Sequence, residues 1–232
     1  MAARYCRGVS SPTRSDAKAN LEKLLTSAAE VFARDGLSAT LADVARHAGV
    51  GVGTVYRRFA NKDDLIYELY APRFKDAERQ AREASEVEDP WEGFVRFFEQ
   101  TARELADDKG HRELVMGGST DSMGWARGTP PDRLVELFGQ SREVIGGHLI
   151  TLVRRAKEAG KLRGDFEASD MMVLSLGVLA AIDFGRPQHP ELYRRTIGLI
   201  LDGLCVARDS PSQLPVPALT GVELVSLAQR RP

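Results

Sequence analysis

Cysteine is scarce in this sequence, with only Cys6 and Cys205 among 232 residues. Two cysteines cannot form a disulfide framework, and these two lack the CxxC spacing of many metal and redox sites. Long apolar runs are also missing: the most apolar stretch, 173–182, has ten residues, whereas a membrane-spanning helix needs about 20. The start, residues 1–15, has basic residues but no apolar core behind them, unlike a secretory signal peptide. We therefore expect a soluble, cytoplasmic protein with reduced thiols.

Signatures of common enzyme classes are absent as well. There is no GxSxG nucleophile motif, and the four histidines are too scattered along the chain to suggest a metal pair. The segment Gly49–Thr54, GVGVGT, is rich in glycine, but it follows an expected helix instead of a strand. Thr54 also stands where the last glycine of a dinucleotide-binding GxGxxG motif would be. The sequence therefore predicts no enzyme, no metal and no cofactor.

The chain has no general excess of basic charge, because 32 Lys and Arg against 33 Asp and Glu give a net charge of −1. The charges are unevenly distributed. Residues 1–65 hold ten basic and seven acidic groups, which leaves 22 basic and 26 acidic groups for the rest. A mildly basic N-terminal part joined to an acidic body is compatible with a local contact to a polyanion.

Helical periodicity is present along almost the whole chain, without a convincing period-2 strand, and predicts an all-α fold. The first helix is expected over 17–34, with Gly36 ending it in the left-handed conformation. Pro72 is expected to kink or break the fourth helix, and the Gly-, Ser- and Pro-rich stretch 117–132 to form a mobile loop. Further helices are expected over 41–48, around 55–59, from 62, from 90 through Leu105, and over 133–159, 168–183 and 191–207.

Residues 40–59, TLADVARHAGVGVGTVYRRF, predict a helix, a tight glycine turn and a second short helix. Thr40 can cap the first helix, and Asp43 completes a T-x-x-D capping box. Between residues 44 and 62 there are four basic residues and no Asp or Glu, as suits a surface that approaches phosphates. The pattern is typical of the helix-turn-helix, whose second helix lies in the DNA major groove.

The stretch 21–69 resembles the DNA-binding domain of the tetracycline-repressor (TetR) family of transcriptional regulators. The matching residues are Phe32, Gly36, Thr40, Val44-Ala45, Ala48-Gly49-Val50, Gly53-Thr54-Val55-Tyr56, Phe59, Asn61-Lys62 and Leu65. The resemblance implies an N-terminal three-helix helix-turn-helix DNA-binding domain followed by a C-terminal helical ligand-binding and dimerisation domain. The expected divisions are a flexible arm over 1–16, the DNA-binding domain over 17–68, the ligand-binding and dimerisation domain over 69–208, and a tail over 209–232.

The resemblance also implies which residues meet DNA. Thr40, Tyr56 and Lys62 fall where family members contact phosphates. The residues that fall where family members approach base edges are Val52, Gly53, Thr54 and Arg57. Arg57 or Arg58 could bind guanine O6 and N7 with two hydrogen bonds.

The sequence departs from the family at Gly51 and Val52, where many members have polar or charged residues. Base reading from the start of the second helix is thereby reduced, and Arg57, Thr54 and DNA shape gain importance. Three alternatives stay open: Tyr56 as a packed aromatic, Arg58 as a solvated surface charge, and Val52 as a core residue.

Large apolar residues of the C-terminal part could line a small-molecule cavity or be ordinary core. The candidates for the cavity are Phe94, Phe98, Met116, Trp125, Phe138 and Met171. The last two helices are so apolar that they need a partner surface, and the resemblance implies that they pair with their symmetry mates. The candidates for this interface are Leu174, Leu179, Ile182, Ile197 and Leu201. A two-fold dimer would present its recognition helices about 34 Å apart, which matches a palindromic operator.

The resemblance predicts a ligand-responsive transcriptional regulator that binds a palindromic operator as a homodimer. Repression is the family default, and a small apolar or amphipathic effector would release the DNA. Its partners would be double-stranded DNA, a second copy of the chain and a small-molecule effector, with no membrane. The alternative is a ligand-independent helix-turn-helix DNA-binding protein, although the body is more than twice the size of the DNA-reading part.

Overall fold

The computed structural model describes residues 14–117, 132–206, 213–220 and 223. In these ranges the chain forms α1 (Arg14–Asp35), α2 (Leu41–Ala48), α3 (Val52–Arg58), α4 (Lys62–Glu86), α5 (Pro90–Asp107), α6 (Lys109–Gly117), α7 (Asp132–Glu158), α8 (Asp170–Gly185) and α9 (Leu192–Leu204). Strand pairing in the same ranges is limited to one isolated bridge, between Leu162 and Cys205. The all-α fold class expected from the sequence is confirmed.

Some expected features fall outside this description. They are residues 1–13 of the expected arm, residues 118–131 of the expected loop and most of the expected tail. In the described part of the chain, no helix has both the length and the apolarity that a bilayer crossing requires.

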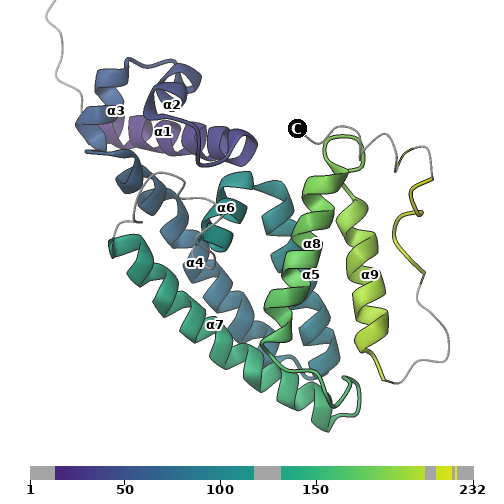
Figure 1. Ribbon diagram of the computed structural model, residues 1–232. Helices are drawn as coiled ribbons and strands as arrows, with labels where there is room; N and C mark the ends of the chain where they lie inside the picture. The colour runs from purple at the N-terminus through teal and green to yellow at the C-terminus, as the bar shows by residue number, and fades with distance from the viewer. Residues whose placement is uncertain (1–13, 118–131, 207–212, 221–222, 224–232) are drawn as a thin grey trace, which may run out of the picture.

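The helices form a small N-terminal unit joined to a larger body (Figure 1). Helices α1, α2 and α3 lie together at one end, and α4 leads from them into the body, where α7 runs beside it. Helices α5, α8 and α9 pack together on the other side of the body. The short α6 contacts both α1 and α5. It therefore connects the small unit with the body.

The cap that the sequence predicts for α2 is present, and a similar cap starts α4. Thr40 Oγ1 accepts a hydrogen bond from the Asp43 backbone N–H at 3.2 Å, and Asp43 Oδ2 accepts one from the Thr40 N–H at 2.9 Å. Gly49 ends α2 with φ +68°, a left-handed conformation that costs glycine little. Asn61 Oδ1 accepts from the Asp64 N–H at 2.8 Å. These local bonds set the ends of α2 and the start of α4.

Two helices depart from the expectation by more than a few residues at their ends. Helix α4 is continuous through Pro72, so the break allowed by the sequence does not occur. Pro72 and Glu68 are exposed, and water can therefore hydrogen-bond the Glu68 carbonyl that loses its helical partner. Helix α6 was not expected at all. It begins after Asp108, whose side chain accepts a hydrogen bond from the His111 N–H at 2.8 Å, so an Asp in a capping position was the available signal.

Two hydrophobic clusters form the core. One joins the small unit to the start of α4 and includes Phe32 and Leu65, both completely buried. This cluster extends past residue 68 to Phe74 of α4, Leu114 of α6 and Leu134 of α7. The other cluster lies among α5, α7, α8 and α9. The small unit is therefore packed directly onto the body through α4, α6 and α7.

Candidate nucleic-acid interface and ligand cavity

Helix α3 has one buried and one exposed face. Val55 and Phe59 are buried in the first cluster. Val52 and Tyr56 are 41% and 55% exposed, so neither is the core residue that the alternative interpretation allowed. The other exposed positions of α3 are Gly53, Arg57 and Arg58. This outward face has two cations and no carboxylate.

The two arginines of α3 lie in its last turn. One Arg57 guanidinium nitrogen donates to Thr54 Oγ1 at 3.0 Å, and the Arg58 guanidinium carbon lies 5.7 Å from the centre of the Phe59 ring. Among the described residues, no carboxylate forms an ion pair with either arginine. Both guanidinium groups can therefore reach an anion without first breaking an ion pair.

Thr40 and Lys62 are held by the protein itself. The Thr40 hydroxyl donates to Asp43 Oδ2 at 2.6 Å as part of the α2 cap. Lys62, at the first position of α4, is half-buried, and its ammonium donates to the Leu37 carbonyl oxygen. Burial lowers the pKa of Lys62, while the nearby carboxylates of Asp63 and Glu113 act in the opposite direction.

A buried carboxylate joins α4 to the start of α6. Asp108 is 2% exposed and accepts hydrogen bonds from Tyr70 Oη at 3.0 Å and from Arg73 at 2.6 Å, besides the His111 backbone bond. Burial and the adjacent Asp108 raise the pKa of Tyr70 far above its usual value. The phenol therefore stays a hydrogen-bond donor.

A second buried charge joins α6 to α5 and α8. The Arg112 guanidinium donates to the Leu105 carbonyl at 2.6 Å and to Asp183 Oδ1 at 2.9 Å. Sequence reasoning missed both Asp108, just before α6, and Arg112 within α6. The ion pairs of Asp108 and Arg112 join residues 35 and 71 positions apart, and such pairing leaves no local pattern in the sequence.

A cavity of about 360 Å³ lies among α4, α5, α6, α7 and the start of α8. This volume lies within the range of small-molecule sites. Apolar side chains make up most of its lining: Phe74, Ala77, Phe97, Leu105, Val115, Phe138, Ile145, Leu149, Ala168, Met171 and Met172. The polar residues of the lining are Thr101, Glu104, His111, Ser141, Arg142 and Ser175.

The six residues expected at a cavity have different positions. Phe138 and Met171 line this cavity, whereas Phe94 and Phe98 do not. Phe94 is completely buried against Trp91 and Phe166, so it is a core residue, and Phe98 is buried in the same cluster. The expected cavity role of Phe94 is therefore wrong for the described cavity. Phe98 lines a small hollow that shares Thr101, Leu105 and Ser175 with the cavity, so its role stays a prediction. The side chain of Met116 and the whole of Trp125 lie outside the description.

His111 is a deeply buried polar group of the cavity wall, at 5% exposed. Its ring stacks on Tyr70, with centroids 5.8 Å apart, and meets the ring of Phe74 edge-on. Within the described residues, His111 Nδ1 has no hydrogen-bond partner. Burial, assisted by the positive charge of Arg73, lowers the pKa of His111 to about 4. At neutral pH the wall therefore has an uncharged imidazole with an unused hydrogen-bonding nitrogen.

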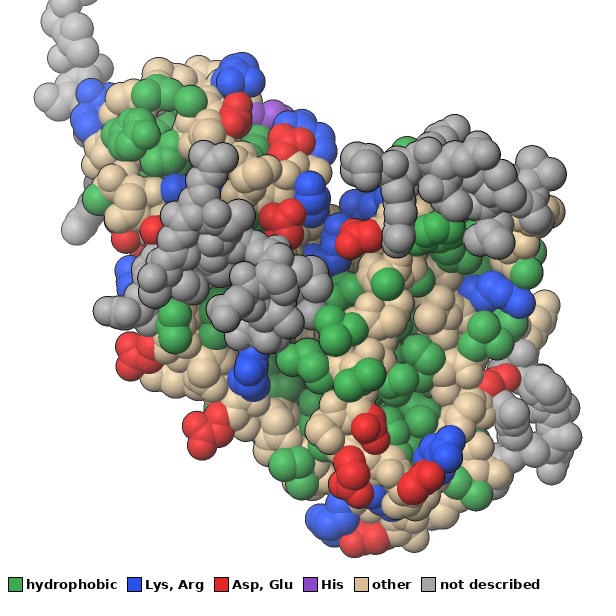
Figure 2. Space-filling view, viewed as in Figure 1, with side chains coloured by type: hydrophobic (Ala, Val, Ile, Leu, Met, Phe, Trp, Pro, Cys, Tyr) green, Lys and Arg blue, Asp and Glu red, His purple; other side chains and the backbone are tan. Residues whose placement is uncertain are grey.

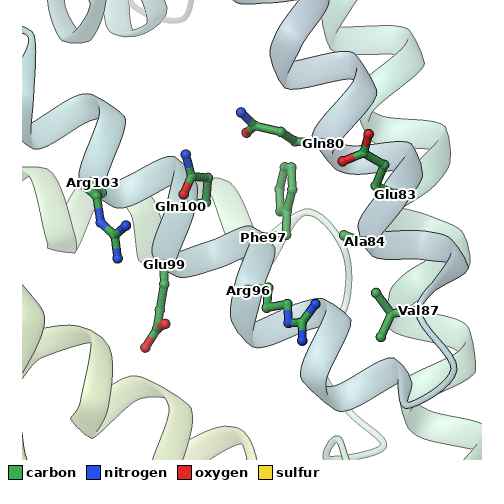
Figure 3. Close-up of a pocket in the computed structure, with 9 residues that line it drawn as sticks. All are labelled: Gln80, Glu83, Ala84, Val87, Arg96, Phe97, Glu99, Gln100 and Arg103. Atoms are coloured by element: carbon green, nitrogen blue, oxygen red, sulfur yellow. The ribbon is translucent and has the colours of Figure 1, made fainter.

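A second hollow, of about 340 Å³, lies between α4 and α5 and is polar (Figure 3). Four of its nine lining residues are charged: Glu83, Arg96, Glu99 and Arg103. Figure 3 shows the Phe97 ring between the two helices, pointing toward Gln80. Phe97 also lines the apolar cavity, so this one side chain contributes to both walls. The mixed charges make the second hollow the poorer match for an apolar ligand.

Large apolar side chains are exposed on α8 and α9, which also have exposed charges at Asp183 and Arg194. Val173 is 65% exposed, Leu199 is 55% exposed, and Met172 is also exposed. Figure 2 shows hydrophobic side chains gathered over α8 and beside it. Exposed large apolar residues that lie together are typical of a surface that contacts another protein.

Most of the expected interface residues do not lie on this surface. Leu179, Ile182 and Ile197 are buried in the core of their own chain, so almost none of their surface is left to contact a partner. That part of the expectation is wrong. Leu174 and Leu201 are half-buried at the edge of the core, and their interface role stays a prediction.

Comparison with known proteins agrees with this architecture. Residues 24–69 match the family model for bacterial regulatory proteins of the tetR family. Residues 89–206 match the model for the C-terminal domain of SbtR-like transcriptional regulators. The chain belongs to the TetR family. This TetR-family protein therefore has a DNA-binding domain and is a transcriptional regulator.

Individual relatives of the TetR-family protein are distant. The regulator SCO0520 from Streptomyces coelicolor is 26% identical, with a TM-score of 0.53 over 81% of this chain and 99% of that chain. YhgD of Bacillus subtilis, an uncharacterized HTH-type regulator, is 38% identical over 69 residues, which span 29% of this chain and only 36% of YhgD. FadR from Bacillus subtilis, solved with stearoyl-CoA, is 16% identical, with a TM-score of 0.53 over 79% and 99% of the two chains.

The buried His111 is expected to make this TetR-family regulator sensitive to acid. Its pKa is about 4 in the folded chain against 6.5 ordinarily, so the unfolded chain takes up the proton first as the pH falls below 6.5. Stability is lost between pH 6.5 and 4, by about 2 kcal/mol at pH 5. Between pH 7.5 and 5, urea unfolding should show that the wild type loses about 2 kcal/mol more than His111→Phe. Equal losses would contradict a buried neutral imidazole.

Proposed function

We propose that this TetR-family regulator is a repressor that binds a palindromic operator as a homodimer and releases it when a small apolar or amphipathic effector binds. The observation that carries the proposal is the mostly apolar cavity of about 360 Å³ in the body. The body is joined to the small unit by α4 and α6. A regulator without a ligand needs no such cavity, which favours this function over ligand-independent DNA binding.

The DNA contacts that we propose lie on α3 and at the starts of α2 and α4. Arg57 and Arg58 are exposed cations that can reach base edges or phosphates. Tyr56 presents a hydroxyl for a phosphate contact, and Lys62 presents an ammonium. The other proposed contacts are Thr40, Val52, Gly53 and Thr54. Their exposure supports the assignment for all but Thr54 and Lys62, which are half-buried.

A second copy of the chain is the proposed occupant of the apolar surface on α8 and α9. Both helices contribute large exposed apolar side chains, with Val173 and Leu199 the most exposed of them. Gly177, Ala180 and Gly203 lie exposed on the same two helices, and small residues allow helices to approach closely. A two-fold dimer would present two copies of α3 to the two halves of an operator.

The proposed effector is an uncharged molecule with a large apolar part and a hydrogen-bonding group. The apolar walls favour the first property, and the neutral His111 favours an uncharged polar group because a neutral imidazole supplies no charge. The solved FadR structure contains stearoyl-CoA, which supports an effector with a long apolar chain. We place this regulator in the cytoplasm, where operator DNA is accessible.

Genomic footprinting with purified protein tests the proposal directly. We expect a small number of protected sites with two-fold symmetry, bound by a dimer. A panel of long-chain alcohols, phenols and fatty-acid methyl esters, added to the protein on a recovered site, should include compounds that raise the melting temperature and release the DNA. Protection without symmetry, or release by none of the compounds that bind, would contradict the proposal.

The two classes of DNA contact are expected to respond differently to mutation. Tyr56→Phe should weaken binding to all sequences by about fivefold, because it removes one phosphate hydrogen bond. Arg57→Ala should cost about 1–3 kcal/mol on the operator and relax the preference at one base pair. Anisotropy titrations against single-base operator variants measure both effects.

Lys161→Ala is the matched control for these two variants. Lys161 is an exposed cation just after α7, at the end of the body away from α3 (Figure 1). It should bind like the wild type. An Arg57→Ala protein that kept the wild-type base preference would remove Arg57 from the proposed contacts.

A further inference from the structure

The turn between α1 and α2 is held at one residue by two opposite charges. The Leu37 backbone N–H donates to Glu113 Oε2 of α6 at 2.6 Å. The carbonyl oxygen of the same Leu37 accepts from the Lys62 ammonium of α4. A carboxylate and an ammonium thus bind the two polar groups of one residue, from helices that are distant in the sequence. Hydrogen bonds to charged partners are about twice as strong as neutral ones.

The fit between Glu113 and this turn is close. Gly36 precedes Leu37 with φ +77°, and a Cβ added there would lie 2.5 Å from Glu113 Oε1. A larger residue at position 36 would therefore displace the carboxylate from the Leu37 N–H, besides being strained at this φ. Lys109 of α6 lies 3.7 Å from the same carboxylate, and its ammonium donates to the Asp35 carbonyl at 3.4 Å. The carboxylate is thus fixed from both sides.

The position of the turn also determines where the Lys62 ammonium lies. A lysine ammonium has three donor hydrogens, and Leu37 uses one of them. The other two remain for an outside acceptor such as a phosphate. Lys62 is half-buried, so this contact limits the freedom of a side chain that would otherwise be flexible. A shift of the Leu37 carbonyl would release the ammonium from this position.

We propose that Glu113 is a positioning residue for DNA binding. It fixes the α1–α2 turn, so that the Leu37 carbonyl holds the Lys62 ammonium ready for a phosphate. The proposal rests on the phosphate contact of Lys62 in the proposed function. The same helix places His111 on the cavity wall, two residues before Glu113. Glu113 thus acts on DNA through Lys62, from the helix that also lines the cavity.

Because Glu113 is negatively charged, a positioning role and a purely electrostatic effect predict different changes in DNA affinity when it is removed. A carboxylate near DNA opposes the phosphate charge, so its removal should strengthen binding if charge alone mattered. If Glu113 acts through position, its removal weakens binding. The two explanations therefore predict opposite signs for Glu113→Ala. Glu113→Gln keeps an amide oxygen that can accept from the Leu37 N–H, and it should retain part of the affinity.

The test measures operator affinity by anisotropy, on a site recovered by footprinting, at several salt concentrations. Glu113→Ala is expected to weaken binding by about tenfold, with Glu113→Gln between it and the wild type. Both Lys62→Ala and Glu113→Ala should lower the slope of log affinity against log salt by roughly 0.9, the value of one phosphate contact. In a Lys62→Ala background, Glu113→Ala should have almost no further effect.

Glu143→Gln, at an exposed carboxylate of α7, is the control for the loss of one negative charge. If Glu113→Ala does not fold, the effect of Glu113→Gln on operator affinity is measured with and without Lys62→Ala instead. Glu113 variants that bind as tightly as the wild type or more tightly would overturn the positioning role. A full effect that persists without Lys62 would also overturn it. A wild-type protein that binds no duplex DNA selectively would instead overturn the proposed function, and this role with it.

Discussion

Asp108→Ala is expected to lower the free energy of unfolding by about 3 kcal/mol, more than any other single change considered for the core. The carboxylate is almost completely buried and accepts from Tyr70, Arg73 and the His111 backbone. Its removal leaves the buried Tyr70 hydroxyl without an acceptor and takes the cap from α6. Arg73 is partly exposed, so water can solvate its charge after the substitution. We therefore expect the decrease in the free energy of unfolding to lie near the lower end of the range for breaking a buried ion pair.

Urea unfolding at one protein concentration, at pH 7.5, measures this loss. Asp76→Ala is the matched control, because Asp76 pairs with Arg79 at the surface, where both side chains are about half exposed. The control should change stability by less than about 0.5 kcal/mol. Asp108→Asn keeps an acceptor for Tyr70 and should lie between the two. A loss below about 1 kcal/mol for Asp108→Ala would show that this cluster does not hold α4 and α6 together.

Val173→Glu is expected to have the largest effect on operator binding. Val173 is mostly exposed on the apolar surface of α8, so the substitution should leave the fold of each chain intact. In a two-fold dimer it would place a carboxylate from each chain in the apolar contact, where burial of a charge without a partner is strongly unfavourable. A monomer has one α3 and can bind one half of an operator. Its affinity should fall by about 100-fold or more, because the second half no longer contributes.

Analytical ultracentrifugation and operator titration test this together. Leu199→Glu, on α9, should have the same effect, since Leu199 is similarly exposed. Ile150→Glu is the control, because Ile150 is 61% exposed on α7, outside the proposed contact. The control should remain a dimer and bind normally. A Val173→Glu protein that stays dimeric with full operator affinity would place the dimer contact elsewhere.

The small N-terminal unit was largely predictable because its signals are local. The Thr40–Asp43 box, the Gly49 turn and the Asn61 cap each depend on residues within a few positions. The buried face of α3 is likewise local, because Val55 and Phe59 lie four positions apart. The exposure of Tyr56 needed the structure, since an aromatic at that position can also pack.

The proposed interface on α8 shows why the outward surfaces of the C-terminal body were harder to predict. Residues 170–185 are apolar on all sides of the helix, with charge only at Asp170 and Asp183. A helix of this kind has no polar stripe to distinguish the outward face from the inward one. The sequence thus identified an apolar helix in need of partners, but Ile182 proved to face the core and Val173 the outside.

The sequence by itself determined the helical fold class, the helix-turn-helix and its caps, because these follow from interactions between residues close together in the chain. Only the tertiary structure decided which aromatic residues line the cavity and which sides of α8 and α9 face outward. It alone brought Glu113 to Leu37 and Asp108 to Arg73, across 76 and 35 positions. Such contacts depend on how whole helices pack, and packing leaves no periodic trace in the sequence.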